Sequence, residues 1–280
     1  QTAALTVYAA SAVDDWLART GVRRIDFLDA FGADVRRLPA MPDAAREREV
    51  RVLVERLNRV YTPDRIPRAE LARRVDARLT DTIAAITGQR VRTSTEIRGF
   101  SVLGVVFPFA LGTSDILSGE VAILRDTGIF EPHVVVHELA HRKGYWKELH
   151  AQVLAYLALA GSDDPVLLQS ALAERLSRQL AALAGDDDDA LGQRVRDAGL
   201  IPEIERQFLR LRQPPDPVTA AVSDAMKQLY DLRLRLTGQN GLSDYDAGFT
   251  AFLYALETGE HAGRAARGEG RVWGLDGIVA

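Results

Sequence analysis

The sequence predicts an α+β fold in which helices predominate and a small β-sheet precedes one central helix. Apolar residues recur every three or four positions over 42–61 and 67–88, a spacing that is typical of amphipathic helices. Between 89 and 125 the pattern changes to β-branched and aromatic residues interrupted by glycine, which indicates short strands. At 280 residues, of which 47% are hydrophobic, the chain is long enough for one large or two modest domains.

Proline and glycine mark the ends of the two predicted N-terminal helices. The first runs from Pro42 to Tyr61 and the second from Pro67 to Gly88. Arginines lie on one face of each helix, but acidic residues are interleaved with them, so we expect a solvated surface rather than a patch for anionic partners. Residues 2–13 are apolar but shorter than the roughly 18 residues needed to cross a bilayer, and we expect them to form an ordinary first helix.

Two segments before the central helix are predicted as strands, Gln89 to Phe109 and Gly119 to Arg125, with Gly112 as a turn between them. Glu131-Pro132 then begins the central helix, because proline is favoured in a first helical turn. His133 follows at once, and we expect it to cap this helix or to face solvent.

The pentapeptide His137-Glu138-Leu139-Ala140-His141 carries the most specific chemistry in the chain. On a helix its two histidines lie about one turn apart, so both imidazoles can reach one Zn²⁺ ion while Glu138 acts as general base. Two of the five histidines of the chain fall in this motif, which favours a ligand role over chance spacing. The motif therefore predicts a zincin-like metallopeptidase core, in which zinc activates the water that attacks a peptide carbonyl.

The third protein ligand to zinc must come from outside this pentapeptide. A metzincin would have a histidine at position 147, but Lys147 stands there, and a protonated lysine cannot ligate zinc. A second helical pattern runs from Lys147 to Leu157 and contains two candidates, Glu148 and His150. These candidates are two positions apart and point to different faces of a helix, so at most one of them is a ligand.

A longer stretch, HELAHRKGYWKELHAQVLAYLAL from His137 to Leu159, resembles the bacterial family known as domain of unknown function 3810. Its members commonly read HELAHQ-x-G, an acidic cluster, Glu-Ala-Asn and an apolar Ala-Tyr-Leu. Val106–Phe109 resembles a Tyr-Phe-Pro-Phe segment of that family, and Gly238–Tyr245 resembles a Gly-Gln-x-x-Gly-Val-x-Ser-Tyr segment. The family is regarded as one of zinc metallopeptidases that are often membrane-anchored, and the resemblance implies the same activity here.

One departure from the family pattern bears on the third ligand. His150 stands where the family has the glutamate of Glu-Ala-Asn, so one competent zinc ligand replaces another. We therefore favour His150 as the third ligand and keep Glu148 as the second choice. Tyr245 lies in the downstream segment of the resemblance and is the preferred donor for stabilising the oxyanion of an amide under attack.

The run from Phe107 to Gly112 has two interpretations. Zincin-type peptidases commonly receive the substrate as an added strand beside the metal, and Phe107 and Phe109 would then bind substrate from an edge strand or from a loop over the cleft. The run is equally well explained as a hydrophobic core strand that Pro108 terminates.

Charge and composition limit the choice of partners. The net charge of −4 gives no reason to expect nucleic acid, and the absence of cysteine excludes disulfides and thiolate ligands. The expected partner is a peptide or protein substrate. Because the chain starts at Gln1 and resembles a membrane-anchored family, we expect a soluble body of a bacterial protein, attached to a membrane through segments absent from this chain or exported. The sequence does not predict the side of the membrane or the oligomeric state.

The preferred hypothesis is a zinc-dependent peptidase with an N-terminal helical region over 1–90 and a zincin-like metal-binding domain over 91–280, which together form one compact unit or two. A second hypothesis is a non-catalytic binding or scaffolding protein that keeps the zincin fold, against which the intact Glu138 argues. A third is a helical interaction module in which the motif is coincidental, and a lack of bound metal would favour it.

Overall fold

A computed structural model of the chain describes residues 20–35, 37–99, 111–114, 120–123, 126–185, 187–211, 228, 231–232, 235, 241 and 247–258. Within these residues the predicted fold class is confirmed: the structure is mostly helical and contains a small three-stranded mixed sheet. The elements in chain order are α2 (Phe27–Phe31), α3 (Asp43–Val60), α4 (Arg68–Thr87), β1 (Ile97–Gly99), β2 (Gly112–Ser114), β3 (Val121–Ile123), η1 (Gly128–Phe130), α6 (Glu131–Arg142), α7 (Glu148–Ala160), α8 (Pro165–Ala184), α9 (Asp188–Asp197), α10 (Pro202–Leu211) and α12 (Ala247–Thr258).

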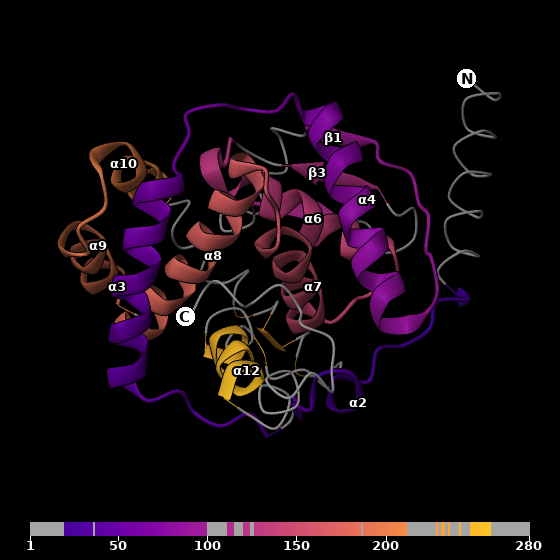
Figure 1. The fold of residues 1–280 in the computed structure, drawn as a ribbon, viewed down its shortest axis with the longest axis horizontal. Helices are drawn as coiled ribbons and strands as arrows, with labels where there is room; N and C mark the ends of the chain where they lie inside the picture. The colour runs from indigo at the N-terminus through magenta and orange to yellow at the C-terminus, as the bar shows by residue number, and fades with distance from the viewer. Residues whose placement is uncertain are drawn as a thin grey trace.

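Helices α6 and α7 form the centre of the structure, between α4 on one side and α8 on the other (Figure 1). Helix α3 packs against the outer side of α8, and α12 packs against α7 and α8. Every residue of α7 except His150 is buried, so this helix is apolar almost all round rather than on one stripe. The helices before residue 90 thus pack directly against those after it.

Local signals predicted the ends of several helices correctly. Pro67 precedes α4, and Gly88 ends it with a positive φ of 73°, a conformation that glycine adopts without steric cost. Helix α6 begins at Glu131, with proline in its first turn as predicted. Beside these predicted ends, the side chain of Asp187 accepts hydrogen bonds from the amides of Asp189 and Ala190 and so caps α9.

The sheet has the strand order β1-β3-β2, with β1 parallel and β2 antiparallel to β3. The prediction of a turn at Gly112 is wrong, because Gly112 is the first residue of β2 and pairs with Ile123. Its lack of a side chain has a packing reason instead: a Cβ atom there would lie 2.8 Å from Oε1 of Glu138 and 3.1 Å from Cγ1 of Val134. Strand β2 therefore runs close against α6.

The last two residues of the segment HELAHRK anchor the chain that leads into the sheet. Arg142 is 3% exposed and donates from Nη1 to the carbonyls of Ser94 and Glu96, each over 2.8 Å. Lys143 is fully buried, pairs with Asp76 at 2.7 Å and donates to the carbonyl of Val91 over 2.9 Å. These two cations hold the segment that leads into β1 against the C-terminal end of α6.

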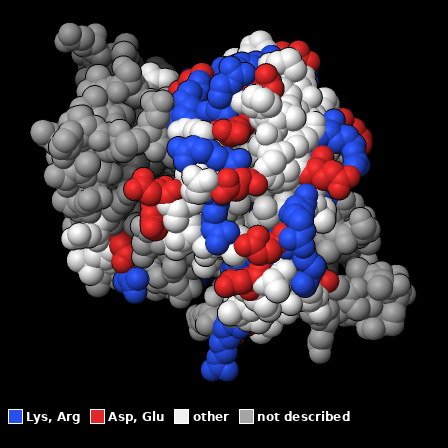
Figure 2. Space-filling model, turned by 90° about the vertical axis from the view of Figure 1, so that its left-hand side faces the viewer, with Lys and Arg blue, Asp and Glu red and all other residues white. Residues whose placement is uncertain are grey.

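The face of the molecule shown in Figure 2 carries cationic and anionic side chains that alternate, rather than a patch of one sign. The described residues include exposed ion pairs, such as Arg59 with Glu55 and Arg194 with Glu47. Exposed pairs of this kind contribute little to stability, about 0–1 kcal/mol each. In the part of the chain that the structure describes, no helix has the length and apolar character needed to cross a membrane.

Candidate metal site

Helices α6 and α7 bring together three side chains that could hold a metal ion, those of His137, His141 and Glu148. Nε2 of His137 lies 3.1 Å from Nε2 of His141, and Oε2 of Glu148 lies 3.2 Å from the first nitrogen and 3.3 Å from the second. The three residues are only 6–8% exposed. Three donor atoms thus form a nearly equilateral triangle inside the protein.

A reversal of the chain at Gly144 creates this arrangement. The amide of Gly144 donates to the carbonyl of His141, and the amide of Tyr145 donates to the carbonyl of Ala140, which together form a Schellman motif at the end of α6. Gly144 has a φ of +96°, a conformation that side chains disfavour. The reversal lets α7 start at Glu148, beside the histidines of α6.

The same reversal fixes the orientation of one imidazole. Nδ1 of His141 lies 2.9 Å from the carbonyl oxygen of Tyr145, and because a carbonyl only accepts, Nδ1 must be the donor. The neutral ring therefore carries its lone pair on Nε2, which faces His137 and Glu148. Trp146 stacks on the His141 ring with an interplanar angle of 5° and 5.9 Å between ring centroids.

The donor set fits a divalent metal ion such as zinc. Zinc is bound in proteins by histidine nitrogens and carboxylate oxygens at about 2.0–2.2 Å, so ligand atoms on a tetrahedron lie roughly 3.3 Å apart. The distances of 3.1–3.3 Å between the three donor atoms agree with that value. Three protein ligands also leave a fourth position for water or substrate, as in catalytic rather than structural zinc sites.

The charges in the site also favour a cation. Burial alone would lower the pKa of His141, but the Glu148 carboxylate raises it to about 9. Burial alone would raise the pKa of Glu148, but His141 and His137 hold it well below its usual value. The site therefore stabilises one positive charge beside the carboxylate, either a proton on His141 or a metal ion that replaces it.

Glu138 lies beside this group and is itself buried, with 6% of its surface exposed. Burial raises its pKa, and the neighbouring His137 and His141 oppose that shift. The side chain packs against the backbone of β2 at Gly112, where only a glycine leaves room for it. The candidate general base is therefore held between its own helix and the sheet.

The structure brings some of the predicted site residues together and not others. His137, His141 and Glu148 meet, whereas His150 is not part of the group. The ring of His150 stacks instead on Phe27 of α2, with 3.9 Å between ring centroids. Two positions along a helix amount to a rotation of about 200°, which explains why Glu148 faces the histidines when His150 does not.

One expectation for α6 is wrong, and three predicted residues are not described. His133 neither caps the helix nor faces solvent, because α8 covers it and leaves it 2% exposed. Phe107, Phe109 and Tyr245, which were predicted to bind substrate or to stabilise the oxyanion, lie outside the described residues.

Three features of the site were not predicted from the sequence: the carbonyl of Tyr145, the stacked Trp146 and the close approach of Gly112. The glycine after the second histidine was the available signal for the first two, since a helix that ends there must turn back. Gly112 had no local signal, because its contact with Glu138 joins residues 26 positions apart.

Comparison with protein families agrees with the motif. The model of the family described as "Protein of unknown function (DUF3810)" matches residues 93–254, which is more than half of the chain. The chain belongs to this family. No match was found among curated proteins or among solved structures.

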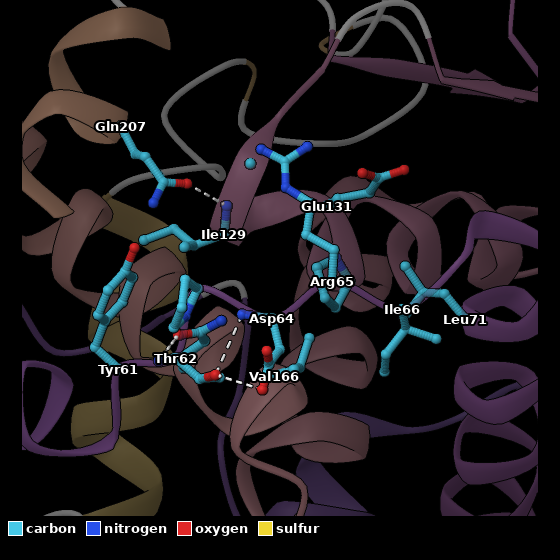
Figure 3. A pocket seen from close by; sticks show the side chains of 14 residues that line it. Tyr61, Thr62, Asp64, Arg65, Ile66, Leu71, Ile129, Glu131, Val166 and Gln207 are labelled. Atoms are coloured by element: carbon cyan, nitrogen blue, oxygen red, sulfur yellow. Dashed lines mark hydrogen bonds between the residues drawn. The ribbon is translucent and has the colours of Figure 1, made fainter. Parts of the chain in front are cut away.

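This DUF3810 chain also has a cavity of about 110 Å³ at the N-terminal end of α6, beside the loop between α3 and α4 (Figure 3). Its polar groups bind one another: Gln169 accepts from the amide of Thr62 over 3.0 Å, and Gln207 accepts from the amide of Ile129 over 2.8 Å. His137 and His141 do not line this cavity, so it is separate from the candidate metal site.

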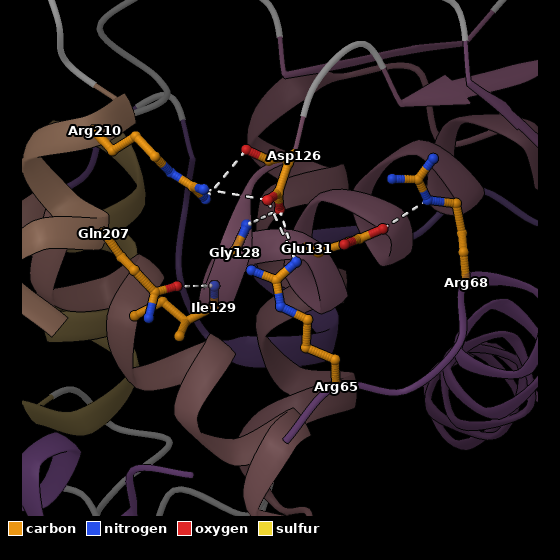
Figure 4. Close-up of polar contacts among 8 residues, drawn as sticks. All are labelled: Arg65, Arg68, Asp126, Gly128, Ile129, Glu131, Gln207 and Arg210. Carbon is orange, nitrogen blue, oxygen red and sulfur yellow. Dashed lines mark hydrogen bonds and ion pairs between the residues drawn. The ribbon is translucent and has the colours of Figure 1, made fainter. Parts of the chain in front are cut away.

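Ion pairs fix the chain that leads into α6 (Figure 4). Asp126 lies between Arg65 and Arg210, 3.2 Å from each, and accepts from the amide of Gly128 over 3.0 Å. Glu131 pairs with Arg68 of α4 at 2.6 Å. Helix α6 of the DUF3810 fold is thus anchored at its N-terminal end by these pairs and at its C-terminal end by Arg142 and Lys143.

We expect the Glu148→Ala variant to lose bound zinc and the His150→Ala variant to retain it, because only Glu148 lies beside the two histidines. The two residues sit in the same turn of α7, so each variant controls for disturbance of that helix. Elemental mass spectrometry after reconstitution with zinc and desalting measures the result. Loss of zinc from the His150 variant alone would instead support a site made of three histidines, His137, His141 and His150.

We expect the Gly144→Ala variant to unfold with a free energy lower by roughly 1–2 kcal/mol, because a Cβ atom disfavours the positive φ that the chain reversal needs. Gly192→Ala is the matched control: Gly192 lies inside α9, and a Cβ there would be 3.6 Å from Arg196, an ordinary contact. This control should gain about 0.5–1 kcal/mol. Urea unfolding measures both changes, and equal effects of the two substitutions would contradict the role of Gly144.

Proposed function

We propose that this protein is a zinc-dependent peptidase in which His137, His141 and Glu148 hold the metal and Glu138 is the general base. The observation that carries the proposal is the buried triangle of donor atoms, 3.1–3.3 Å on a side, with the carboxylate of Glu138 beside it. Two imidazoles and one carboxylate are the ligands of several zinc hydrolases. The site also contains Glu138, the glutamate that hydrolysis needs as a base. A purely structural zinc site does not need such a residue.

Each group has a separate task in the proposed reaction. Zinc, when bound, lowers the pKa of a water molecule to about 7 and polarises the carbonyl of the substrate. Glu138 accepts the proton that this water loses and then donates it to the amide nitrogen that leaves. Burial raises the pKa of Glu138, and a higher pKa favours the uptake of a proton by this carboxylate. The hydrogen bond from His141 to Tyr145 keeps the ligand ring oriented throughout.

An extended peptide is the substrate that fits this arrangement. Among the described strands β2 pairs with β3 alone, and its first residue lies against Glu138. A peptide added along the edge of β2 would form backbone hydrogen bonds and bring its carbonyl groups close to the general base. The proposed substrate class is therefore an unfolded peptide or a protein segment that can adopt an extended conformation.

Three residues are proposed to complete the site, Phe107 and Phe109 from the way zincin-type peptidases receive substrate and Tyr245 from the family resemblance. Phe107 and Phe109 would contact the side chains of the bound peptide, since they precede β2 by a few residues. Tyr245 would donate a hydrogen bond to the oxyanion. These roles are independent of the metal ligands.

We expect the Glu138→Gln variant to retain zinc and to lose peptidase activity by about 10²–10⁴-fold in kcat/KM, the usual contribution of general acid–base catalysis. Glu131→Gln is the matched control, because Glu131 lies on the same helix but pairs with Arg68 at its far end. It should change kcat/KM by less than about threefold. Cleavage of a quenched-fluorescent peptide library by the zinc-loaded proteins measures the difference.

These experiments test the metal site and the peptidase reaction separately. An active Glu138→Gln variant would show that this residue is not the base. A wild-type protein that binds zinc but cleaves no member of the library would contradict the peptidase proposal and leave the metal site intact, in favour of a non-catalytic zincin fold.

A further inference from the structure

A buried carboxylate on α8 lies beside the two helices that carry the candidate ligands. His133 lies one turn before His137 on α6, and Gln152 lies one turn after Glu148 on α7. Both side chains point to Glu174: Nε2 of Gln152 donates to its Oε1 over 2.5 Å, and Nε2 of His133 lies 3.9 Å from the same oxygen. A hydrogen bond therefore links α7 to Glu174 one turn away from Glu148. The ring of His133 lies beyond hydrogen-bond distance of the carboxylate, but the amide of His133 donates to Oγ of Ser170 over 3.0 Å and so bonds α6 to the same helix, α8.

Three members of this polar group are enclosed in the core, and the fourth, Arg178, is partly exposed. Glu174 is 3% exposed, and His133 and Gln152 are each 2% exposed. Arg178, one turn further along α8, donates to the same oxygen over 2.7 Å. Burial alone would raise the pKa of Glu174, but Arg178 and the other neighbours lower it to about 2, while burial lowers the pKa of His133 to about 4. The group therefore contains a carboxylate, its arginine partner and a neutral imidazole.

Stability alone is a weak reason for such a group. The burial of a carboxylate costs free energy even when a partly exposed arginine pairs with it, and apolar residues of similar volume often replace a buried pair without loss of stability. What apolar residues cannot do is fix direction, because hydrophobic contacts have no angular preference. Hydrogen bonds and charges can therefore set the relative position of α6 and α7 more narrowly than packing does.

We propose that Glu174 is a positioning residue for the metal site: through its hydrogen bond to Gln152 it holds α7 on α8, to which Ser170 also bonds α6, and thereby sets the distance of Glu148 from the two histidines. This inference rests on the proposed ligand set but not on peptidase activity. Glu174 contacts neither the ligand atoms nor Glu138, so its effect on the metal is transmitted by the helices.

The test compares zinc affinity and cobalt spectra of the full chain and its variants. We expect Glu174→Gln to bind Zn²⁺ about 10-fold more weakly than the wild type, the lower end of the range found when direct hydrogen-bond partners of metal ligands are removed, because Glu174 acts only through the helices. The d–d absorption bands of bound Co²⁺ should also change, because they report ligand geometry rather than global stability. Gln152→Met removes one donor at nearly constant volume. Like Glu174→Gln, it should weaken zinc binding and change the cobalt spectrum.

Gln179→Leu is the matched control on the same helix. Gln179 is fully buried like Glu174, but it bonds Arg46 at 2.7 Å and Met41 at 3.3 Å, on the side of α8 that faces α3. This control should keep zinc affinity within about threefold of the wild type and leave the cobalt spectrum unchanged, whatever stability it loses in urea.

Unchanged zinc affinity and an unchanged cobalt spectrum in Glu174→Gln would overturn the positioning role, as would an equal loss of affinity in the control. If Glu174→Gln does not fold, the Gln152→Met variant decides by the same two measurements. A wild-type chain that binds no zinc overturns both this inference and the proposed metal site, whereas a wild type that binds zinc without cleaving peptides leaves this inference standing.

Discussion

The hydrogen bond from Nδ1 of His141 to the carbonyl of Tyr145 is the contact on which the site depends. It forms because Gly144 reverses the chain directly after α6, so that a backbone carbonyl returns to the ring of the preceding turn. It places the lone pair of Nε2 toward His137, and the same reversal starts α7 with Glu148 facing both imidazoles. A segment of 12 residues thus contains all three candidate ligands, and the rest of the fold holds it in place.

The burial that the surrounding helices impose on the Glu148 carboxylate favours a cation beside it. Helices α4 and α8 enclose α6 and α7 and leave the three donor groups almost without solvent. A carboxylate in such surroundings is stable only when it is paired and hydrogen-bonded. The helix that carries the histidines is held at one end by the ion pairs of Glu131 and Asp126 and at the other by Arg142 and Lys143. A rigid site of this kind keeps its ligands in position before the metal arrives.

Much of this arrangement was predictable from the sequence where local signals decided it. Proline and glycine marked the ends of α4 and α6, and the HExxH spacing identified two of the three residues that could hold a metal ion. The features that were not predicted from the sequence depend on contacts between residues that are far apart in the chain. Glu148 rather than His150 meets the histidines because the chain reverses at Gly144, and His133 is buried because α8, about 40 residues later, covers it. A glycine is needed at position 112 because the side chain of Glu138 on α6 packs against it, and not because the chain turns there. The division into two regions at residue 90 remains a prediction.

X-ray absorption at the zinc edge of the reconstituted wild-type protein tests the ligand set most directly. The predicted spectrum has two imidazole nitrogens and oxygen ligands from Glu148 and a water molecule, at about 2.0–2.2 Å from the metal. Scattering from three imidazoles would contradict the assignment of Glu148, and a protein that retains no zinc after reconstitution would contradict the metal site itself.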